Sequence, residues 1–337
     1  MEVAPDDPQP FPVPGVTGDQ AIETRALTKT FKGGIEAVCG VDLSVASGEM
    51  FGFLGPNGAG KTTMVRMLCT LLPPTAGTAS VAGVDVVVDA AGVRRRIGVA
   101  LQEIGLDPVQ TGRELLELQC GLYGIPRLQA KARTAELLEL VGLLDAADRR
   151  TKTYSGGMKR RLDLASALVH SPEVLFLDEP TTGLDPSSRR TIWEEVRRIN
   201  DSGTTVFLTT QYLEEADQLC NRLAIIDAGA IVAEGTPAQL KAKMGHDVVT
   251  LALAGGDAVA TERAIAELRG LERVVAEPDA LALYVEDGAG SITEIVRLLE
   301  GGGIEVGAIT VSRPSLDDVF LQATGRRLEG AEEEKAA

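Results

Sequence analysis

Two kinds of hydrophobic pattern divide the chain. Between about residues 19 and 244, continuous apolar runs alternate with stretches of helical spacing, and the clearest runs are FGFLG (Phe51–Gly55), VLFLD (Val174–Asp178) and VFLTT (Val206–Thr210). Runs that are apolar at every position are typical of strands buried on both faces of a parallel sheet, whereas half-exposed strands alternate apolar and polar residues. The pattern therefore predicts an α/β domain built on a parallel sheet.

Helical spacing without strand signals occupies about residues 104–165, where ELLELQCGLYG is followed by AELLELVGLL. We interpret this stretch as a helical subdomain inserted into the α/β core. After Gly245 the segments change to the order strand, helix, strand, strand, helix, strand, which is typical of a small α+β, ferredoxin-like unit. We expect this second domain to cover about residues 247–325 and to close with a short helix that begins after Ser315.

The two ends of the chain carry little hydrophobic pattern. Repeated prolines punctuate residues 1–18, and the chain closes with EGAEEEKAA, so we expect a disordered proline-rich tail at 1–18 and an acidic tail at 326–337. No apolar stretch is long enough to suggest a membrane-spanning helix. The first residues are acidic and proline-rich rather than basic and then apolar, which argues against a secretory signal.

The amino-acid composition indicates which kinds of molecule the protein is suited to bind. The 337 residues include 33 Lys and Arg against 49 Asp and Glu, which gives a formal net charge of −16. Nucleic acids and anionic lipid surfaces are bound by cationic patches, so this balance disfavours both as main partners. The four cysteines are scattered, without a C-x-x-C pair, and we expect them to be reduced and buried rather than metal ligands.

The segment GPNGAGKTT follows the strand FGFLG directly and opens a helix, which is the context that the G-x-x-x-x-G-K-[ST] motif requires. Gly58 and Gly60 let backbone N–H groups turn toward phosphates, and the N-terminus of the helix adds positive potential. Lys61 is placed to reach the β- and γ-phosphates, and the Thr62 hydroxyl is placed to bind Mg²⁺. The predicted nucleotide-binding residues are therefore Gly55, Pro56, Asn57, Gly58, Ala59, Gly60, Lys61, Thr62 and Thr63.

The segment LFLDEP supplies acidic residues at the end of a second buried strand. Ligands collect at the carboxyl ends of parallel strands, so Asp178 and Glu179 are expected to face the phosphate loop. Asp178 is predicted to hold Mg²⁺, directly or through water. Glu179 is predicted to orient or deprotonate an attacking water.

The segment YSGGMKRR offers a second anion site. Ser155, Gly156 and Gly157 provide a hydroxyl and open backbone N–H groups where a helix begins. An S-G-G triplet alone is also consistent with a simple loop and helix cap. Its position ahead of the strand VLFLD, with GLD (Gly183–Asp185) after that strand, favours a role at the nucleotide.

With these motifs in this order, the chain resembles the nucleotide-binding subunits of ABC transporters from about Ile22 to Met244. The resemblance implies ATP and Mg²⁺ as cofactors and a head-to-tail homodimer, in which the phosphate loop of one subunit and Ser155–Gly157 of the other enclose each ATP. It implies that Asp185 acts across that interface and that Gln102 senses Mg²⁺ and contacts a membrane partner. It also implies that Phe31 stacks on adenine, for which ordinary core packing is the alternative.

The family usually has a histidine after the strand VFLTT, and this chain has Gln211. A glutamine amide can donate a hydrogen bond to a γ-phosphate, but it carries no charge and cannot transfer a proton. We therefore predict that Gln211 senses the γ-phosphate and that Glu179 is the principal base, with Lys61 as the third catalytic residue.

The segments TTQYLEEADQL and RPSLDDVFL (Arg313–Leu321) resemble the daunorubicin-resistance type of bacterial drug-exporter ATPase. That resemblance implies a subunit at the cytoplasmic face of the membrane that hydrolyses ATP and powers efflux of a drug, antibiotic or lipid through a separate permease. The second domain would regulate turnover or support the dimer, or else serve as a structural cap.

Two other functions are compatible with a phosphate loop. A soluble ABC-type clamp acting in DNA repair or translation predicts a long coiled-coil insertion or a second cassette, together with a basic face, and the sequence has none of these. A regulatory protein that holds ATP without hydrolysing it is disfavoured because Lys61 and Glu179 are both in place.

Overall fold

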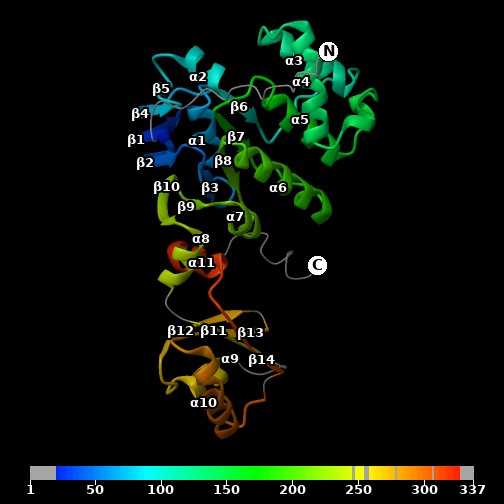
Figure 1. Cartoon of the computed structure of the whole chain (residues 1–337). Coiled ribbons are helices and arrows are strands. Elements are labelled where there is room, and N and C mark those ends of the chain that lie inside the picture. Colours follow the sequence, from blue (N-terminus) through cyan, green and yellow to red (C-terminus); the bar gives the residue numbers. More distant parts are fainter. Residues whose placement is uncertain (1–19, 245–246, 254–257, 278, 306, 327–337) are drawn as a thin grey trace, which may run out of the picture. The chain divides into compact units, whose positions relative to one another are not determined.

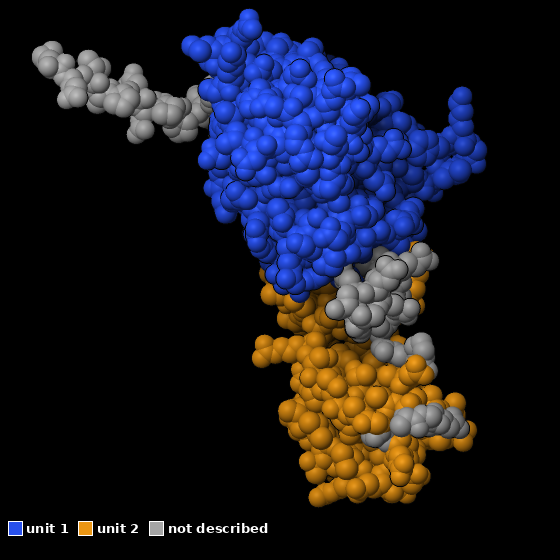
Figure 2. Space-filling model, turned by 90° about the vertical axis from the view of Figure 1, so that its right-hand side faces the viewer, with its two compact units in different colours: residues 1–236, 328–337 blue, residues 237–327 orange. Residues whose placement is uncertain are grey.

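The computed structural model describes residues 20–244, 247–253, 258–277, 279–305 and 307–326 (Figure 1). These residues form two compact units, one ending at Thr236 and the other beginning at Pro237 (Figure 2). The division precedes the expected change at residues 244–247 because helix α8 (Pro237–Lys243) packs against α11 (Leu316–Thr324) of the second unit. The expected proline-rich tail lies outside the described residues, as does the expected acidic tail beyond Arg326.

A six-stranded sheet forms the centre of the first unit, in the order β10-β9-β3-β8-β7-β6 (Figure 1). The strands from β9 to β6 run parallel, and only β10 pairs in the antiparallel sense, with β9. Every residue of β3, β7 and β8 is buried, so the predicted strands with two covered faces are confirmed. The strand bounds are β3 (Met50–Leu54), β6 (Ile97–Ala100), β7 (Val174–Asp178), β8 (Thr205–Thr210), β9 (Arg222–Asp227) and β10 (Ala230–Gly235).

The hydrophobic core of this unit lies between the central sheet and a second, antiparallel sheet of order β2-β1-β4-β5. Helix α1 (Lys61–Leu68) contributes its buried apolar side chains to that core. On the central sheet, the ring of Phe207 lies 5.6 Å from that of Phe176 and 5.8 Å from that of Phe51, so three neighbouring strands are joined by aromatic contacts. The remaining elements are β1 (Gln20–Phe31), β2 (Ile35–Ala46), β4 (Ala76–Val81), β5 (Val84–Asp85), α2 (Ala90–Arg96), α6 (Pro186–Asp201) and α7 (Leu213–Leu219).

The segment between β6 and β7 is helical, which confirms the predicted inserted subdomain. Helix α3 begins with a capping box, in which the Thr111 side chain accepts from the Glu114 N–H and the Glu114 carboxylate accepts from the Thr111 N–H. The subdomain consists of α3 (Gly112–Leu122), α4 (Arg127–Leu140), the 3₁₀ turns Leu144–Ala146 and Thr151–Thr153, and α5 (Gly156–Ala167).

After α8, the second unit has the element order β-α-β-β-α-β that the sequence pattern predicts, and α11 follows. Its four strands form an antiparallel sheet of order β12-β13-β11-β14. A core between this sheet and the helices α9 and α10 includes Val249, Leu283, Ile265 and Ile295. The bounds are β11 (Asp247–Ala252), α9 (Ala258–Ile265), β12 (Leu271–Glu277), β13 (Ala280–Val285), α10 (Gly288–Gly301) and β14 (Ala308–Ser312).

Two expectations from composition can be compared with the fold. Among the described residues, no helix is both long enough and apolar enough to cross a bilayer. Cys69, Cys120 and Cys220 are buried and free, as expected, but Cys39 is exposed. The expectation of burial is wrong for Cys39 because it lies on β2, an edge strand of the antiparallel sheet.

Helix α6 buries one acidic side chain whose titration should be visible in the stability of the protein. Glu195 is 1% exposed, and burial raises the pKa of its carboxyl from 4.5 to about 8, against the opposing effect of Arg161 and Arg198. The folded state therefore holds this proton between pH 4.5 and about 8, while the unfolded chain releases it, so this carboxyl lowers the free energy of unfolding as the pH rises through that range.

We therefore expect Glu195→Gln to gain thermal stability over the wild type progressively from pH 5 to pH 8, as measured by melting temperature. Asp201→Asn, which replaces an exposed carboxylate on the same helix, is the matched control, and the gain of Glu195→Gln with pH is measured relative to it. A difference for Glu195→Gln that is constant with pH would contradict the assignment of a protonated buried carboxyl.

Candidate active site

The phosphate loop connects the end of β3 to the start of α1 at the carboxyl edge of the parallel sheet (Figure 1). The Gly55 N–H donates to the Thr210 carbonyl at 3.2 Å, which attaches the loop to the end of β8, and the Ala59 N–H donates to the Pro56 carbonyl at 3.2 Å. The predicted segment Gly55–Thr63 thus forms the turn and the first residues of the helix.

Gly60 shows why this loop needs glycine. Its φ is +108°, and a Cβ placed there would lie 2.3 Å from the Ala37 carbonyl oxygen. Both the backbone conformation and the close approach of β2 exclude a side chain. The start of α1 is therefore open for backbone N–H groups to meet an anion, as the motif predicts.

Lys61 lies at the centre of the site. Its ammonium donates to the carbonyls of Gly55 at 2.7 Å and Pro56 at 3.0 Å, and it lies 3.1 Å from the Glu179 carboxylate. Lys61 is 4% exposed and Glu179 is 7% exposed. Since both charges are almost removed from water, the pair is a strong local electrostatic feature.

The acidic residues follow β7. One carboxylate oxygen of Asp178 accepts from the Thr209 hydroxyl at 2.5 Å, while its Oδ2 is buried without a hydrogen-bond partner. Glu179 has a φ of +49°, and its N–H donates to the Thr209 carbonyl. A left-handed glutamate is uncommon and strained, and such outliers concentrate at functional sites. The other carboxylate oxygen of Glu179 accepts from the Thr182 hydroxyl at 3.2 Å.

The two predicted glutamines follow the strands on either side of β7, which are β8 and β6. Gln211 comes directly after Thr210, whose carbonyl binds the phosphate loop, and it is half-buried. Gln102 lies two residues beyond β6 and is exposed. Strand β8 lies between β3 and β7, and β6 pairs with the other side of β7, so the fold places both glutamines at the edge that carries Asp178.

A second group of predicted residues surrounds the start of α5. Ser155 caps this helix by accepting from the Met158 N–H, and a Cβ on Gly157 would lie 3.0 Å from the Ser188 hydroxyl. Asp185 accepts from the Ser188 hydroxyl at 2.6 Å, and this bond lowers the pKa of Asp185. No hydrogen bond or ion pair in the described part of the chain joins Ser155–Gly157 or Asp185 to Lys61 or Asp178.

Phe31 ends β1 and is 40% exposed, with the Lys29 ammonium 5.5 Å from the centre of its ring. Part of the Phe31 ring is therefore accessible to solvent, whereas the ring of a core residue would be buried.

The sequence matches two family models, "ABC transporter" over residues 38–182 and "ATP-binding protein DrrA1-3-like, C-terminal domain" over residues 235–324. The chain is 47% identical to the daunorubicin/doxorubicin resistance ATP-binding protein DrrA of Streptomyces peucetius over 329 residues, covering 94% of this chain and 98% of the relative. The chain belongs to the ABC transporter family, among its DrrA-like ATP-binding proteins. As in the rest of the family, its cassette binds and hydrolyses ATP.

Other relatives and solved structures share the same cassette. The chain is 42% identical to the Nod factor export ATP-binding protein I of Paraburkholderia xenovorans, covering 92% of this chain and 99% of that one. A dimeric structure of the ATP-binding cassette MJ0796, in a post-hydrolysis state with ADP and phosphate, superposes with a TM-score of 0.59 at 27% identity, covering 64% of this chain and 98% of that one.

Several side chains that hold the ABC site together were not predicted. Thr209 binds Asp178, and its signal was the pair of threonines that ends the apolar run VFLTT. Arg160 on α5 is buried and donates to the carbonyls of Asp178 and Pro180. Its signal was its spacing, since it falls on the same helical stripe as the buried residues Leu164 and Ala167.

A buried carboxyl also supports the turn after β7. Glu215 on α7 is fully buried, and its Oε1 accepts from the Thr181 hydroxyl and from the Trp193 indole N–H, both at 2.9 Å. Burial raises the pKa of Glu215, and the hydrogen bonds oppose the rise. The turn after β7, helix α6 and helix α7 are thus joined at one carboxyl group.

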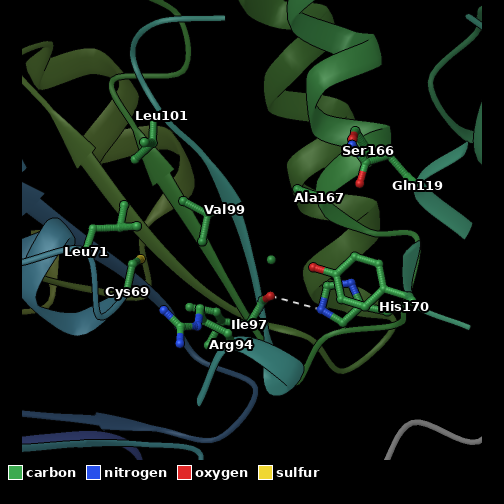
Figure 3. A pocket seen from close by; sticks show the side chains of 12 residues that line it. Cys69, Leu71, Arg94, Ile97, Val99, Leu101, Gln119, Ser166, Ala167 and His170 are labelled. Atoms are coloured by element: carbon green, nitrogen blue, oxygen red, sulfur yellow. Dashed lines mark hydrogen bonds between the residues drawn. The ribbon is translucent and has the colours of Figure 1, made fainter. Parts of the chain in front are cut away.

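A cavity of about 360 Å³ opens between the central sheet of the ABC cassette and its helical subdomain. Figure 3 shows Leu71, Val99 and Leu101 on one side and Gln119 and His170 on the other. The His170 ring stacks on that of Tyr123 with centroids 3.9 Å apart, and its Nε2 is hydrogen-bonded to the Ile97 carbonyl. Leu101, which lines the cavity, precedes Gln102 directly.

The position of Lys61 leads to a prediction about nucleotide binding. Removal of the ammonium in Lys61→Ala should weaken ATP binding by roughly 100-fold or more, because several hydrogen bonds from a charged donor to phosphate are lost. Titration with a fluorescent ATP analogue measures the change. Lys61→Met, which keeps the apolar stem, should show the same loss, and Lys152→Ala, at an exposed lysine, should show none. Unchanged affinity in both Lys61 variants would refute the assignment of the phosphate loop.

Proposed function

We propose that this protein is the ATP-hydrolysing subunit of a bacterial exporter, which moves a drug, antibiotic or lipid through a separate membrane permease. The observation that carries the hydrolytic part is the meeting of Lys61, Asp178 and Glu179 at one edge of the sheet. The names of the relatives support the export part, since they refer to drug resistance and to export of a Nod factor. A clamp that acts in DNA repair or translation gains no support from them.

The residues at the sheet edge fit a nucleotide with a divalent cation. Oδ2 of Asp178 is buried and unpartnered, and a carboxylate oxygen in that state is stabilised by a cation in contact with it. In this proposal Thr62, Gln102 and Asp178 hold Mg²⁺, which neutralises charge on the phosphates. Lys61 and the loop Gly55–Thr63 hold the phosphates.

Within the chain, Glu179 has the role of principal base. The hydroxyl of Thr182 and the ammonium of Lys61 hold its carboxylate, and its backbone is fixed at a φ of +49°. A carboxylate held in place at the edge of a phosphate site is suited to orient and deprotonate a water. Gln211 has the role of γ-phosphate sensor, and Phe31, with its partly exposed ring, stacks on adenine.

The group formed by Ser155, Gly156, Gly157 and Asp185 supports a dimer. These residues form a surface around the start of α5 that makes no hydrogen bond or ion pair, in the described part of the chain, with the phosphate-loop lysine or with Asp178. A helix start with free N–H groups favours an anion, and the phosphate loop of a second copy would present one. We therefore include a head-to-tail homodimer in the proposal, with two ATP molecules between the copies.

The cavity beside Gln102 supports a membrane partner. Apolar side chains near it are exposed, including Leu71 at 55% and Tyr123 at 44%. Exposed apolar patches of this kind mark protein interaction sites. An apolar segment of the permease at this cavity would place the protein at the cytoplasmic face of the cell membrane, and it would lie one residue from Gln102.

Replacement of the proposed base separates hydrolysis from binding. Glu179→Gln keeps the size of the side chain and its ability to accept a hydrogen bond but loses the basic oxygen. We expect the rate of ATP hydrolysis to fall by roughly 100- to 10,000-fold with nucleotide affinity retained. Because ATP is then no longer consumed, light scattering should detect an ATP-dependent dimer.

The matched control is Glu214→Gln, an exposed carboxylate on α7, which should hydrolyse ATP at the wild-type rate. Hydrolysis by Glu179→Gln at the wild-type rate would mean that another group is the base. A monomer in the presence of ATP and Mg²⁺ would count against the dimer, even with hydrolysis abolished.

The proposed role of Gln211 predicts an effect on turnover more than on binding. Gln211→Ala removes one hydrogen bond to a charged phosphate, so we expect kcat to fall by about tenfold and the affinity for ATP to change by less than about threefold. Gln211→His restores an ionisable group and should give a kcat that changes with pH near 6.5. Wild-type kinetics in Gln211→Ala would leave this glutamine as a strand terminus without a role in hydrolysis.

A further inference from the structure

Arg160 connects three separate segments through one buried guanidinium. It lies on α5 and is 4% exposed. Its Nε donates to the Pro180 carbonyl at 2.9 Å, its Nη2 donates to the Asp178 carbonyl at 3.1 Å, and its Nη1 donates to the Leu101 carbonyl. No partner of these three bonds is a side chain, so the contact depends on the orientation of backbone groups.

Two of these carbonyls flank the proposed base. Asp178 and Pro180 lie on either side of Glu179, whose own N–H is bonded to the Thr209 carbonyl and whose φ is +49°. A strained backbone conformation persists only where its surroundings hold it. Arg160 and Thr209 together bind both polar groups of the peptide between Asp178 and Glu179, and Arg160 also binds the carbonyl of Pro180. The direction of the Glu179 carboxylate depends on these two peptide groups.

The third carbonyl belongs to the segment that leads to the helical subdomain. Leu101 lines the cavity between sheet and helices and precedes Gln102. Arg160 itself is on the helix that begins with Ser155, at the start of which lie the residues of the second anion site. The side chain of Arg160 therefore connects α5, which carries the second anion site at its start, with the turn that contains Glu179 and with the segment before Gln102.

The charge of the guanidinium is matched where it is buried. Asp163, one turn further along α5, lies 3.3 Å from Nη1, and the carboxylates of Asp178 and Glu215 also stabilise the charge of the arginine electrostatically. Burial raises the pKa of Asp163 to about 6, with Arg160 opposing the rise. Four N–H···O contacts in different directions are within reach of a planar guanidinium, whereas a lysine ammonium is a single point donor on a flexible stem.

We propose that Arg160 is a positioning residue, which fixes the backbone turn that carries Glu179 and joins it to the segment leading to Gln102. The inference rests on the proposed role of Glu179 as base. In this arrangement a displacement of the helical subdomain, or of the segment after β6, would move the backbone at Glu179 through the hydrogen bonds of Arg160 rather than through side-chain packing.

The test compares turnover and binding in Arg160→Gln and Arg160→Lys, in the full chain with ATP and Mg²⁺. Misplacement of a reacting group by about 1 Å can cost about 100-fold in rate. We expect Arg160→Gln to lower kcat by about 10- to 100-fold, while KM and the Kd of a fluorescent ATP analogue stay within about threefold. Arg160→Lys keeps the charge but cannot reach all three carbonyls, so its kcat should be intermediate.

The matched control is Arg133→Gln. Arg133 is also largely buried, at 11% side-chain exposure, and donates to the carbonyls of Leu168 and Val169 just after α5, away from Glu179. We expect this variant to lose melting temperature to a similar degree and to keep kcat, per folded molecule, within about twofold of the wild type. Hydrogen exchange gives a second readout, since the amides of Glu179, Thr181 and Thr182 should exchange faster in Arg160→Gln but not in Arg133→Gln.

Two results would overturn the inference, namely wild-type kcat in Arg160→Gln, or parallel losses of binding and turnover that follow the folded fraction as in Arg133→Gln. If Arg160→Gln does not fold, full activity of Arg160→Lys would have the same meaning. The failure of the proposed base is recognised separately, because Glu179→Gln would then hydrolyse ATP whatever the arginine variants do. An inactive Glu179→Gln with a fully active Arg160→Gln would reject only the role of the arginine.

Discussion

The parallel pairing of β3, β8, β7 and β6 is the constraint on which the site depends. Leu54 is paired with Thr210, Asp178 with Thr209 and Ala100 with Leu177, so the four strands end at one level. Residues that follow these ends leave the sheet at the same edge, which is where ligands bind in open α/β folds. The phosphate loop, the acidic pair and the two glutamines therefore need no other long-range contact to come together. The bond from the Gly55 N–H to the Thr210 carbonyl then fixes the loop to this edge.

The residues placed at this edge are costly for stability. Removal of the Lys61 and Glu179 charges from water costs several kcal/mol for each ion, and the hydrogen bonds from Lys61 to two carbonyls and from Thr182 to Glu179 offset part of it. A left-handed backbone at Glu179 adds about 1–3 kcal/mol of strain. Apolar side chains at these positions would stabilise the fold at least as well, because a buried ion pair is often no better than a hydrophobic replacement. The arrangement is therefore explained by chemistry at the site rather than by stability.

The sequence was sufficient to predict those parts of the fold and site in which a physical requirement determines the type of side chain. Burial of both faces makes β3, β7 and β8 continuously apolar, and the approach of β2 to Gly60 demands a residue without a side chain. The sequence was insufficient to predict contacts made with the backbone. Arg160 is the example, because any residue could supply the three carbonyl groups to which it donates. The burial of Cys39 was predicted wrongly because the residue types of an exposed edge strand do not differ from those of a covered strand. The division at Thr236 precedes the expected change of pattern because the sequence of α8 does not tell which unit the helix packs on.

The three donors of the Lys61 ammonium link binding to catalysis in the proposed mechanism. Two of them meet the Gly55 and Pro56 carbonyls and the third meets the Glu179 carboxylate, and an ammonium has no fourth. A triphosphate that takes up Lys61 must replace at least one of these partners. Where it replaces the carboxylate, Glu179 is released from its cation and becomes available to accept a proton from water, and Gln211, being uncharged, does not compete for that proton. The carboxylate would then keep its direction through the Thr182 hydroxyl and through its backbone, and the carbonyls on both sides of that backbone are bound by Arg160. The same event that binds the nucleotide thus frees the base from Lys61 and leaves its orientation to Thr182 and to the backbone that Arg160 binds.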